Sequence, residues 1–228
     1  MRCARLRDLG LLLGFALAFA ASSPSSRGQT APPAAPARDD IVNTLSQFDT
    51  GPDLDLPALK QKIAERSRMR GRKEPEPSKR PLIVPELTGL PTVNLAIRFD
   101  VDTPIILPES YETVGRLADA LVNAPLLPYT FLIVGHSDSN GKREANVILS
   151  QRRADAIRDV LVNTFKISAK RLQSLGLGEE QFIDQAHPTS PVNLQLQIVT
   201  VGKVPETEPT AQPAAVTPAA KKSAKKKK

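Results

Sequence analysis

The chain of 228 residues contains no tryptophan, and aromatic residues make up only 4% of it. Its single cysteine is Cys3, and its only histidines are His136 and His187. One cysteine cannot form a disulfide within the chain. Two isolated histidines do not provide the clustered ligands of a metal site. No cysteine follows Cys3, and no Ser-His-Asp pattern is present to supply an activated nucleophile. The sequence therefore predicts no enzyme and no cofactor, and we expect His136 to pack at the end of a strand.

Positive charge is plentiful but concentrated at one end of the chain. The formal net charge is +7, yet residues 95–203 are close to neutral and residues 204–228 carry most of the excess as lysines. Basic charge that belongs to a tail, and not to a folded face, argues against a structured nucleic-acid site. We expect residues 204–228 to be a disordered lysine-rich tail.

The first twenty residues have the pattern of an export signal. Arg2, Arg5 and Arg7 precede a short apolar run over residues 11–20, which ends in small residues. This pattern predicts a signal peptide over residues 1–20. Cys3 lies before the apolar run, whereas a lipoprotein signal places its cysteine after that run, so no lipid anchor is expected.

Residues 21–92 are rich in proline and charge, which predicts a linker. Short helical patterns occur at 39–48 and 56–70, and Leu59, Ile63 and Arg66 share one face of the second. Because both patterns are short and polar, we expect weak helices in a tether that forms no second core.

Residues 93–203 have the patterns of one folded domain. Alternating or continuous apolar runs predict strands at 93–101, 130–134, 172–175 and 193–201, and 3.6-residue spacing predicts helices at 111–122 and 142–165. The order β-α-β-α-β-β predicts an α+β fold, a two-layer sandwich with helices on one face of a mixed sheet.

The long helix over 142–165 is predicted to carry two neighbouring apolar rows, and Arg153 lies within the second. The first row is Ser150, Ala154, Ile157 and Leu161, and the second is Leu149, Ala156 and Val160. Position alone leaves three alternatives for the Arg153 guanidinium: it extends past the apolar row into solvent, it forms a structural ion pair, or it binds an anion at the edge of the row. The preceding turn carries Asp138. A carboxylate and a guanidinium that converge can bind a zwitterion, because one takes its ammonium and the other its carboxylate.

The residues around this pair resemble the C-terminal domain of the OmpA family, which also occurs in peptidoglycan-associated lipoprotein and MotB-type proteins. The matching residues are Gly135-His136-Ser137-Asp138, Gly141, Asn146, Leu149-Ser150 and Arg153-Ala154, with Phe99-Asp100-Val101-Asp102 and Gly176-Leu177-Gly178-Glu179 outside the turn and helix. The resemblance covers roughly residues 95–201. It implies non-covalent binding of peptidoglycan, which would tether the protein to the cell wall in the periplasm, with association with the outer membrane left open.

The resemblance also implies roles for individual residues. Asp138 would receive the ammonium of meso-diaminopimelate in the peptide stem, and Arg153 the neighbouring carboxylate. Asn146 and the backbone of Ser137–Asp138 would orient the stem, and Asp102 would border the same cleft.

One departure from the family pattern leaves a second hypothesis open. Family members close with asparagine-arginine-arginine-valine, whereas this chain has Asn193-Leu194-Gln195-Leu196. Without the two arginines, the domain is alternatively a degenerate wall-binding module in an envelope-tethering protein, whose lysine-rich tail binds anionic lipid or lipopolysaccharide. Glu179 and Glu180 follow a glycine turn, and we expect them to be solvated.

Overall fold

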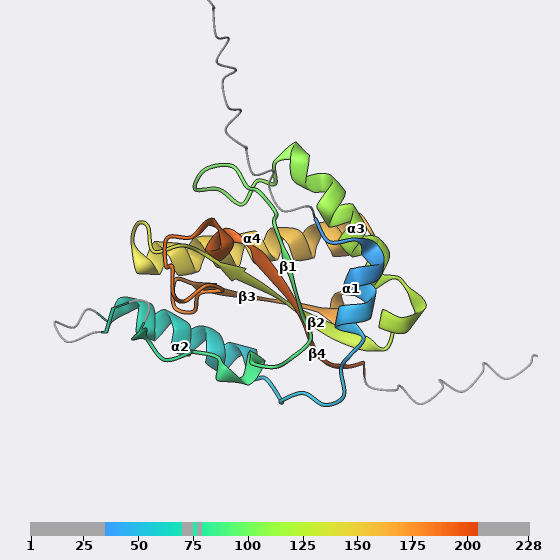
Figure 1. Ribbon diagram of the computed structural model, residues 1–228, viewed down its shortest axis with the longest axis horizontal. Helices are drawn as coiled ribbons and strands as arrows, with labels where there is room; N and C mark the ends of the chain where they lie inside the picture. The colour runs from blue at the N-terminus through green and yellow to red at the C-terminus, as the bar shows by residue number, and fades with distance from the viewer. Residues whose placement is uncertain (1–34, 70–74, 77–78, 205–228) are drawn as a thin grey trace, which may run out of the picture. The chain divides into compact units, whose positions relative to one another are not determined.

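The computed structural model describes residues 35–69, 75–76 and 79–204 (Figure 1). The predicted signal peptide and residues 205–228 of the predicted tail lie outside these ranges. The helices and strands are α1 (Arg38–Leu45), α2 (Leu56–Arg68), β1 (Thr92–Leu95), α3 (Tyr111–Leu121), β2 (Tyr129–His136), α4 (Arg143–Asn163), β3 (Leu172–Gly178) and β4 (Leu196–Lys203). From β1 onward, their order confirms the predicted β-α-β-α-β-β sequence.

The four strands form one mixed sheet in the order β1-β4-β2-β3. β4 pairs antiparallel with β1 and with β2, whereas β2 and β3 are parallel. A parallel pair needs a crossover connection, and α4 provides it. β2 has a partner on both sides, and its residues 131–136 are all buried, which explains its continuous apolar run. The predicted α+β class is thereby confirmed.

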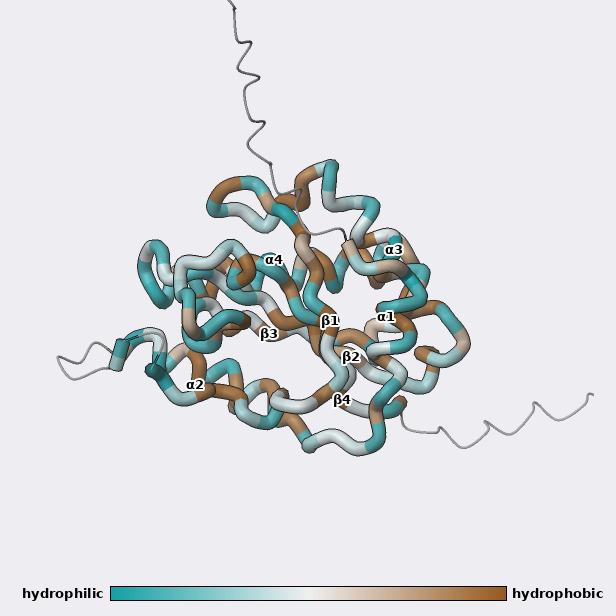
Figure 2. The backbone as a smooth tube through the Cα atoms, in the orientation of Figure 1, coloured by the Kyte–Doolittle hydropathy of each residue, from teal (hydrophilic) through white to brown (hydrophobic). Residues whose placement is uncertain are grey.

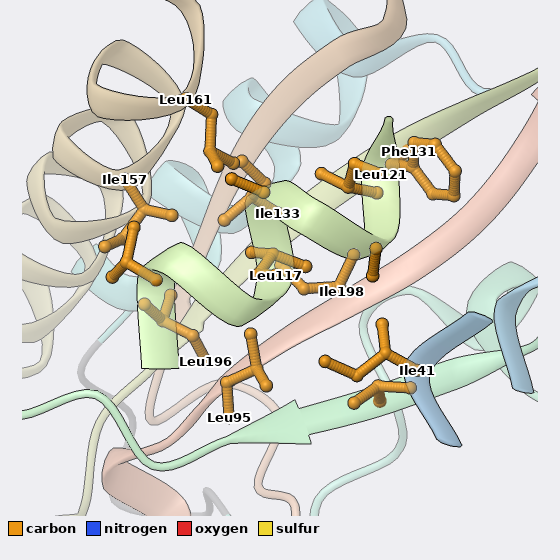
Figure 3. Packing of buried hydrophobic residues seen from close by; sticks show 14 of the residues in the cluster. Ile41, Leu95, Leu117, Leu121, Phe131, Ile133, Ile157, Leu161, Leu196 and Ile198 are labelled. Atoms are coloured by element: carbon orange, nitrogen blue, oxygen red, sulfur yellow. The ribbon is translucent and has the colours of Figure 1, made fainter. Parts of the chain in front are cut away.

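Helices α1, α3 and α4 cover one face of the sheet. Figure 3 shows Phe131 and Ile133 of β2 and Ile198 of β4 packed with Leu117 of α3 and Ile157 of α4. The first apolar row predicted along α4 is confirmed, since its members are buried: Ser150, Ala154, Ile157 and Leu161. α1 contributes Ile41 and Leu45 to this core, both 0% exposed.

Helix α2 covers the opposite face of the sheet. In Figure 1, α2 (teal) lies on the other side of the strands from α4. Its Leu59 and Ile63 belong to a second apolar cluster, which includes Leu132 and Val134 of β2 and Val84 from the segment after α2. The prediction of a tether that forms no second core is therefore wrong for the described part of residues 21–92. Two apolar residues one turn apart are enough, because the sheet supplies the rest of the apolar surface.

Glycines allow α4 to lie directly against β2 and β3. A Cβ at Gly135 would lie 2.3 Å from the carbonyl oxygen of Ser150, and one at Gly176 would lie 2.3 Å from the amide nitrogen of Gln151. Gly178 meets the same helix one turn earlier and has a φ of +54°. The backbone of α4 thus packs on the backbone of the sheet, and its first half lies beside the end of β2.

Two strands are shorter than predicted. β1 ends at Leu95, where the amide of Ile97 donates to the Leu95 carbonyl (3.0 Å) in a tight turn. The apolar alternation continues to residue 101 because Ile97 is buried in an irregular segment. β4 begins at Leu196, since Pro191–Leu194 forms a 3₁₀ turn in which Asn193 is fully buried.

Gly176→Ala is expected to destabilise the protein, because the new methyl group collides with the backbone of α4. Overpacking of this kind costs about 1–3 kcal/mol or more, measured as the free energy of unfolding by urea denaturation. Gly115→Ala is the matched control. Nothing lies within 4 Å of a Cβ at this position in α3, so it should raise the stability by roughly 0.5–1 kcal/mol. Equal effects of the two changes would contradict the direct packing of α4 on the sheet.

Ile63→Ala is expected to lower the free energy of unfolding by about 2–5 kcal/mol, because it opens a cavity between α2 and the sheet. Ile63 is 1% exposed, whereas its neighbour Lys62 is exposed, so Lys62→Ala should change the stability by less than about 0.5 kcal/mol. If α2 did not pack on the sheet, Ile63→Ala and Lys62→Ala would both change the free energy of unfolding by equally small amounts.

Candidate functional site

Asp138 lies in the turn between β2 and α4. The amide of Ser137 donates to the carbonyl of Gly178 (3.0 Å), which prolongs the pairing of β2 with β3. The Asp138 carboxylate accepts hydrogen bonds from the backbone amide (3.2 Å) and the side-chain amide (2.5 Å) of Asn140. Gly141 completes the turn with a φ of +93°. These contacts hold a half-buried carboxylate in place in a hydrophilic turn, the teal loop between β2 and α4 in Figure 2.

Arg153 reaches from the middle of α4 to the loop over residues 99–106. Its Nε donates to the carbonyl of Thr103 (3.1 Å), and one Nη contacts the carbonyl of Asp100 (3.5 Å). The guanidinium lies over the Phe99 ring, 5.1 Å from the ring centre. Arg153 is therefore held in place by two backbone oxygens and an aromatic face, and not by a carboxylate.

The charges near Arg153 act on it from a distance. Burial lowers the pKa of Arg153, while the charges of Asp102 and Asp138 act to raise it. Among the described residues, no carboxylate oxygen comes within the 4.0 Å that defines an ion pair with its guanidinium. The site thus brings an acid from a turn and a cation from a helix to one cleft without a direct ion pair between them.

The loop over residues 99–106 carries Asp102 at its exposed tip. A bridge between Phe99 and Ile106 closes the loop, and the amide of Asp100 donates to the carbonyl of Ile105 (2.8 Å). Asp102 has a φ of +54°, a left-handed conformation that aspartate tolerates better than most residues.

These elements enclose a cleft of about 440 Å³. All five residues predicted from the sequence line it, namely Asp102, Ser137, Asp138, Asn146 and Arg153. The apolar part of the lining comes from Ile97, Phe99, Val101, Leu149 and Leu194. The structure therefore brings the predicted set together, although it does not test whether these residues bind a ligand.

Ser137 is a lining residue of this cleft, but its hydroxyl oxygen is buried. The residue is 4% exposed, and its Oγ has no hydrogen-bond partner in the described part of the chain. Buried polar groups nearly always have a partner, so the Ser137 hydroxyl marks a place where a bound water molecule would complete the hydrogen bonding.

Asn146 shapes the turn from the first half of α4. Its side-chain nitrogen lies 2.9 Å from the Asn140 carbonyl, 3.4 Å from the Asp138 carbonyl and 2.9 Å from Oε2 of Glu179. With its amide hydrogens used in this way, Asn146 holds the position of Asp138. The predicted role of Asn146 in orienting the stem stays a prediction.

Leu194 lies where the resemblance leads us to expect an arginine. It lines the cleft and is 42% exposed, so an apolar wall takes the place of a second cation at this point. Besides Arg153, the lining includes one further cation, Arg98, whose side chain is 74% exposed and lies 3.7 Å from Glu109.

Two acids that we expected to be solvated are buried behind the turn. Glu179 and Glu180 are 4% and 2% exposed, and they pair with Arg66, Arg80 and Arg143. The three arginines are far apart in the sequence, so no local pattern could have revealed this cluster. His136 is also buried; its ring nitrogens contact oxygens of Gln181 and Gln197, and burial lowers its pKa.

In the described part of the chain, no helix combines the length and the apolar character that spanning a membrane requires.

Comparison with known proteins identifies the domain that contains the cleft. The sequence model of the OmpA family matches residues 98–193. Outer membrane porin F of Pseudomonas aeruginosa is 36% identical over 97 residues, which make up 42% of this chain and 27% of that protein. Peptidoglycan-associated lipoprotein of Brucella melitensis is 36% identical over 92 residues, 40% of this chain and 53% of that protein. The chain thus matches between a quarter and about half of the length of these relatives.

Solved structures are similar to about half of this chain. The OmpA-like domain of FopA1 from Francisella tularensis is 16% identical, with a TM-score of 0.41 over 50% of this chain and 75% of that one. The sequence match spans the 99–106 loop, the β2–α4 turn and Arg153, and residues 98–193 of this chain form a domain of the OmpA family.

Proposed function

We propose that the cleft binds peptidoglycan without covalent chemistry, through the meso-diaminopimelate of the peptide stem, and that this binding tethers the protein to the cell wall. The observation that carries the proposal is the separation of Asp138 and Arg153. Both line one cleft, and they form no direct ion pair with each other. A ligand that carries an ammonium and a carboxylate on the same carbon completes both partners.

Each residue has a role that follows from its position. Asp138 takes the ammonium, and Asp102 adds negative charge from the opposite loop. Arg153 takes the carboxylate with the guanidinium nitrogens that its backbone contacts leave available. Ser137 lines the cleft beside Asp138 and orients the peptide part of the stem through its backbone.

The expected affinity for a single stem is modest. A hydrogen bond to a charged group contributes about 1.5–3 kcal/mol, so two of them with a few neutral contacts give a dissociation constant on the order of micromolar to millimolar. A polymer with many stems compensates for this, because a released domain rebinds to a neighbouring stem.

The relatives support this proposal through their names. One is a peptidoglycan-associated lipoprotein and the other an outer membrane porin, and neither name is that of an enzyme. A non-enzymatic wall-binding role places the protein in the cell envelope, and we infer the periplasm as its compartment, since peptidoglycan lies there.

Asp138→Ala and Arg153→Ala are each expected to weaken binding to isolated sacculi at least tenfold, because each removes one charged contact. Co-sedimentation of the full chain with sacculi measures the loss. Asp119→Ala and Arg152→Ala are the matched controls, since both are exposed and neither belongs to the proposed contacts, and they should bind like the parent. Unfolding curves of all four variants show whether the fold is kept. If the folded Asp138 and Arg153 variants sediment like the parent, the proposed site is wrong.

Leu194→Arg is expected to tighten binding of a stem tripeptide, L-alanyl-γ-D-glutamyl-meso-diaminopimelate, by about tenfold, because it adds a cation to the cleft wall. Val192→Arg adds the same charge in the same 3₁₀ turn but outside the cleft lining, so it should change the affinity by less than about twofold at 0.15 M salt. Isothermal titration calorimetry compares the two. Equal gains would indicate general attraction to an anionic ligand and would count against the cleft.

A further inference from the structure

A buried carboxylate lies directly behind the proposed ligand-binding turn. Glu179 follows β3, and one of its oxygens, Oε2, accepts from the side-chain amide of Asn146 (2.9 Å). The same amide donates to the carbonyl of Asn140 (2.9 Å) and lies 3.4 Å from that of Asp138. Glu179 therefore contacts the turn indirectly, through one intervening side chain, the amide group of Asn146.

The other oxygen of Glu179 belongs to a charge cluster. Oε1 accepts from Arg80 (3.3 Å) and lies 3.8 Å from Nε of Arg143. The side chain of Glu179 is only 5% exposed, and those of Arg80 and Arg143 are 10% and 14% exposed. A carboxylate with so little access to water is held in one place by its cations and is a strong hydrogen-bond acceptor toward Asn146.

The neighbouring acid makes no such connection. Glu180 is equally buried and accepts from Arg143 (2.6 Å) and Arg66 (3.1 Å). In the described part of the chain it has no hydrogen bond to Asn146 or to the turn. Two adjacent carboxylates thus share one cluster, and only Glu179 contacts the residue that supports Asp138.

We infer that Glu179 is a positioning residue for the peptidoglycan-binding turn, because it orients the Asn146 amide that holds the Asp138 backbone in its bound geometry. The inference rests on the proposed function and extends it beyond the cleft lining, to which Glu179 does not belong. It also makes the segment before the family match part of the site, since Arg80 precedes residues 98–193. An Asp138 carboxylate that is already held in position binds the ligand more tightly than a mobile one, because less conformational entropy is lost on binding.

The test measures the turn and the ligand separately in the full-length chain. Amide hydrogen exchange of ligand-free protein reports the turn through Ser139 and Asn140, whose amides bond to the Pro188 carbonyl and the Asp138 carboxylate. Calorimetry with L-alanyl-γ-D-glutamyl-meso-diaminopimelate reports the ligand. Glu179→Ala is expected to speed exchange at these amides and to weaken tripeptide binding by about tenfold each. Glu179→Gln keeps an oxygen acceptor without the charge. Its effects on amide exchange and on tripeptide affinity should therefore be about half as large as those of Glu179→Ala on a logarithmic scale.

Glu180→Ala and Glu180→Gln are the matched controls, because they remove the same charge from the same cluster. They should lower the unfolding midpoint as the Glu179 variants do. The rates of amide hydrogen exchange in the turn and the affinity for the tripeptide should stay within about twofold of the parent. If Glu179→Ala does not fold, the two glutamine variants decide. The inference is overturned if both Glu179 variants match their Glu180 counterparts in turn exchange and affinity. If the parent itself fails to bind the tripeptide, the proposed function falls, and the exchange data still decide whether Glu179 positions the turn.

Discussion

The contact of α4 with the backbone of β2 and β3 is the constraint on which the cleft depends. Because Gly135 and Gly176 have no side chains, the helix lies at backbone distance from the sheet. Asn146 and Arg153 are two turns apart on this helix, a rise of about 10 Å. The first then reaches the β2–α4 turn, and the second reaches the 99–106 loop. A side chain between helix and sheet would displace both from their partners.

The sequence predicts those parts of the molecule in which spacing along one element decides the outcome. The order of strands and helices, the buried row of α4 and the approach of Arg153 to Asp138 all follow from periodicity within residues 93–203 and from the family pattern. The docking of α2 could not be predicted in this way, because Leu59 and Ile63 make a weak pattern until the opposite face of the sheet is known. The burial of Glu179 was not predicted for the same reason, since its partner Arg80 is 99 residues away in sequence.

Charge is organised in two different ways on either side of the β2–α4 turn. Behind the turn, Glu179 and Glu180 are buried and closely paired with arginines, and these pairs connect α2 and the segment after it to the end of β3. In front of the turn, Asp138 and Arg153 share a cleft without pairing. Burying an ion without a partner costs desolvation free energy. Partly exposed ions in a cleft remain hydrated, so they can stay unpaired in the ligand-free protein at little cost. Asn146 stands between the two regions.

The shortness of β1 has a consequence for how copies of the chain meet at high concentration. β1 is an edge strand of only four residues, and the tight turn at Ile97 ends it. An edge strand exposes unpaired amide and carbonyl groups that can template the strand of another molecule, and a longer edge is a better template. Four residues offer few hydrogen bonds for such an addition. The short length of this edge strand therefore disfavours strand addition by another copy of the chain.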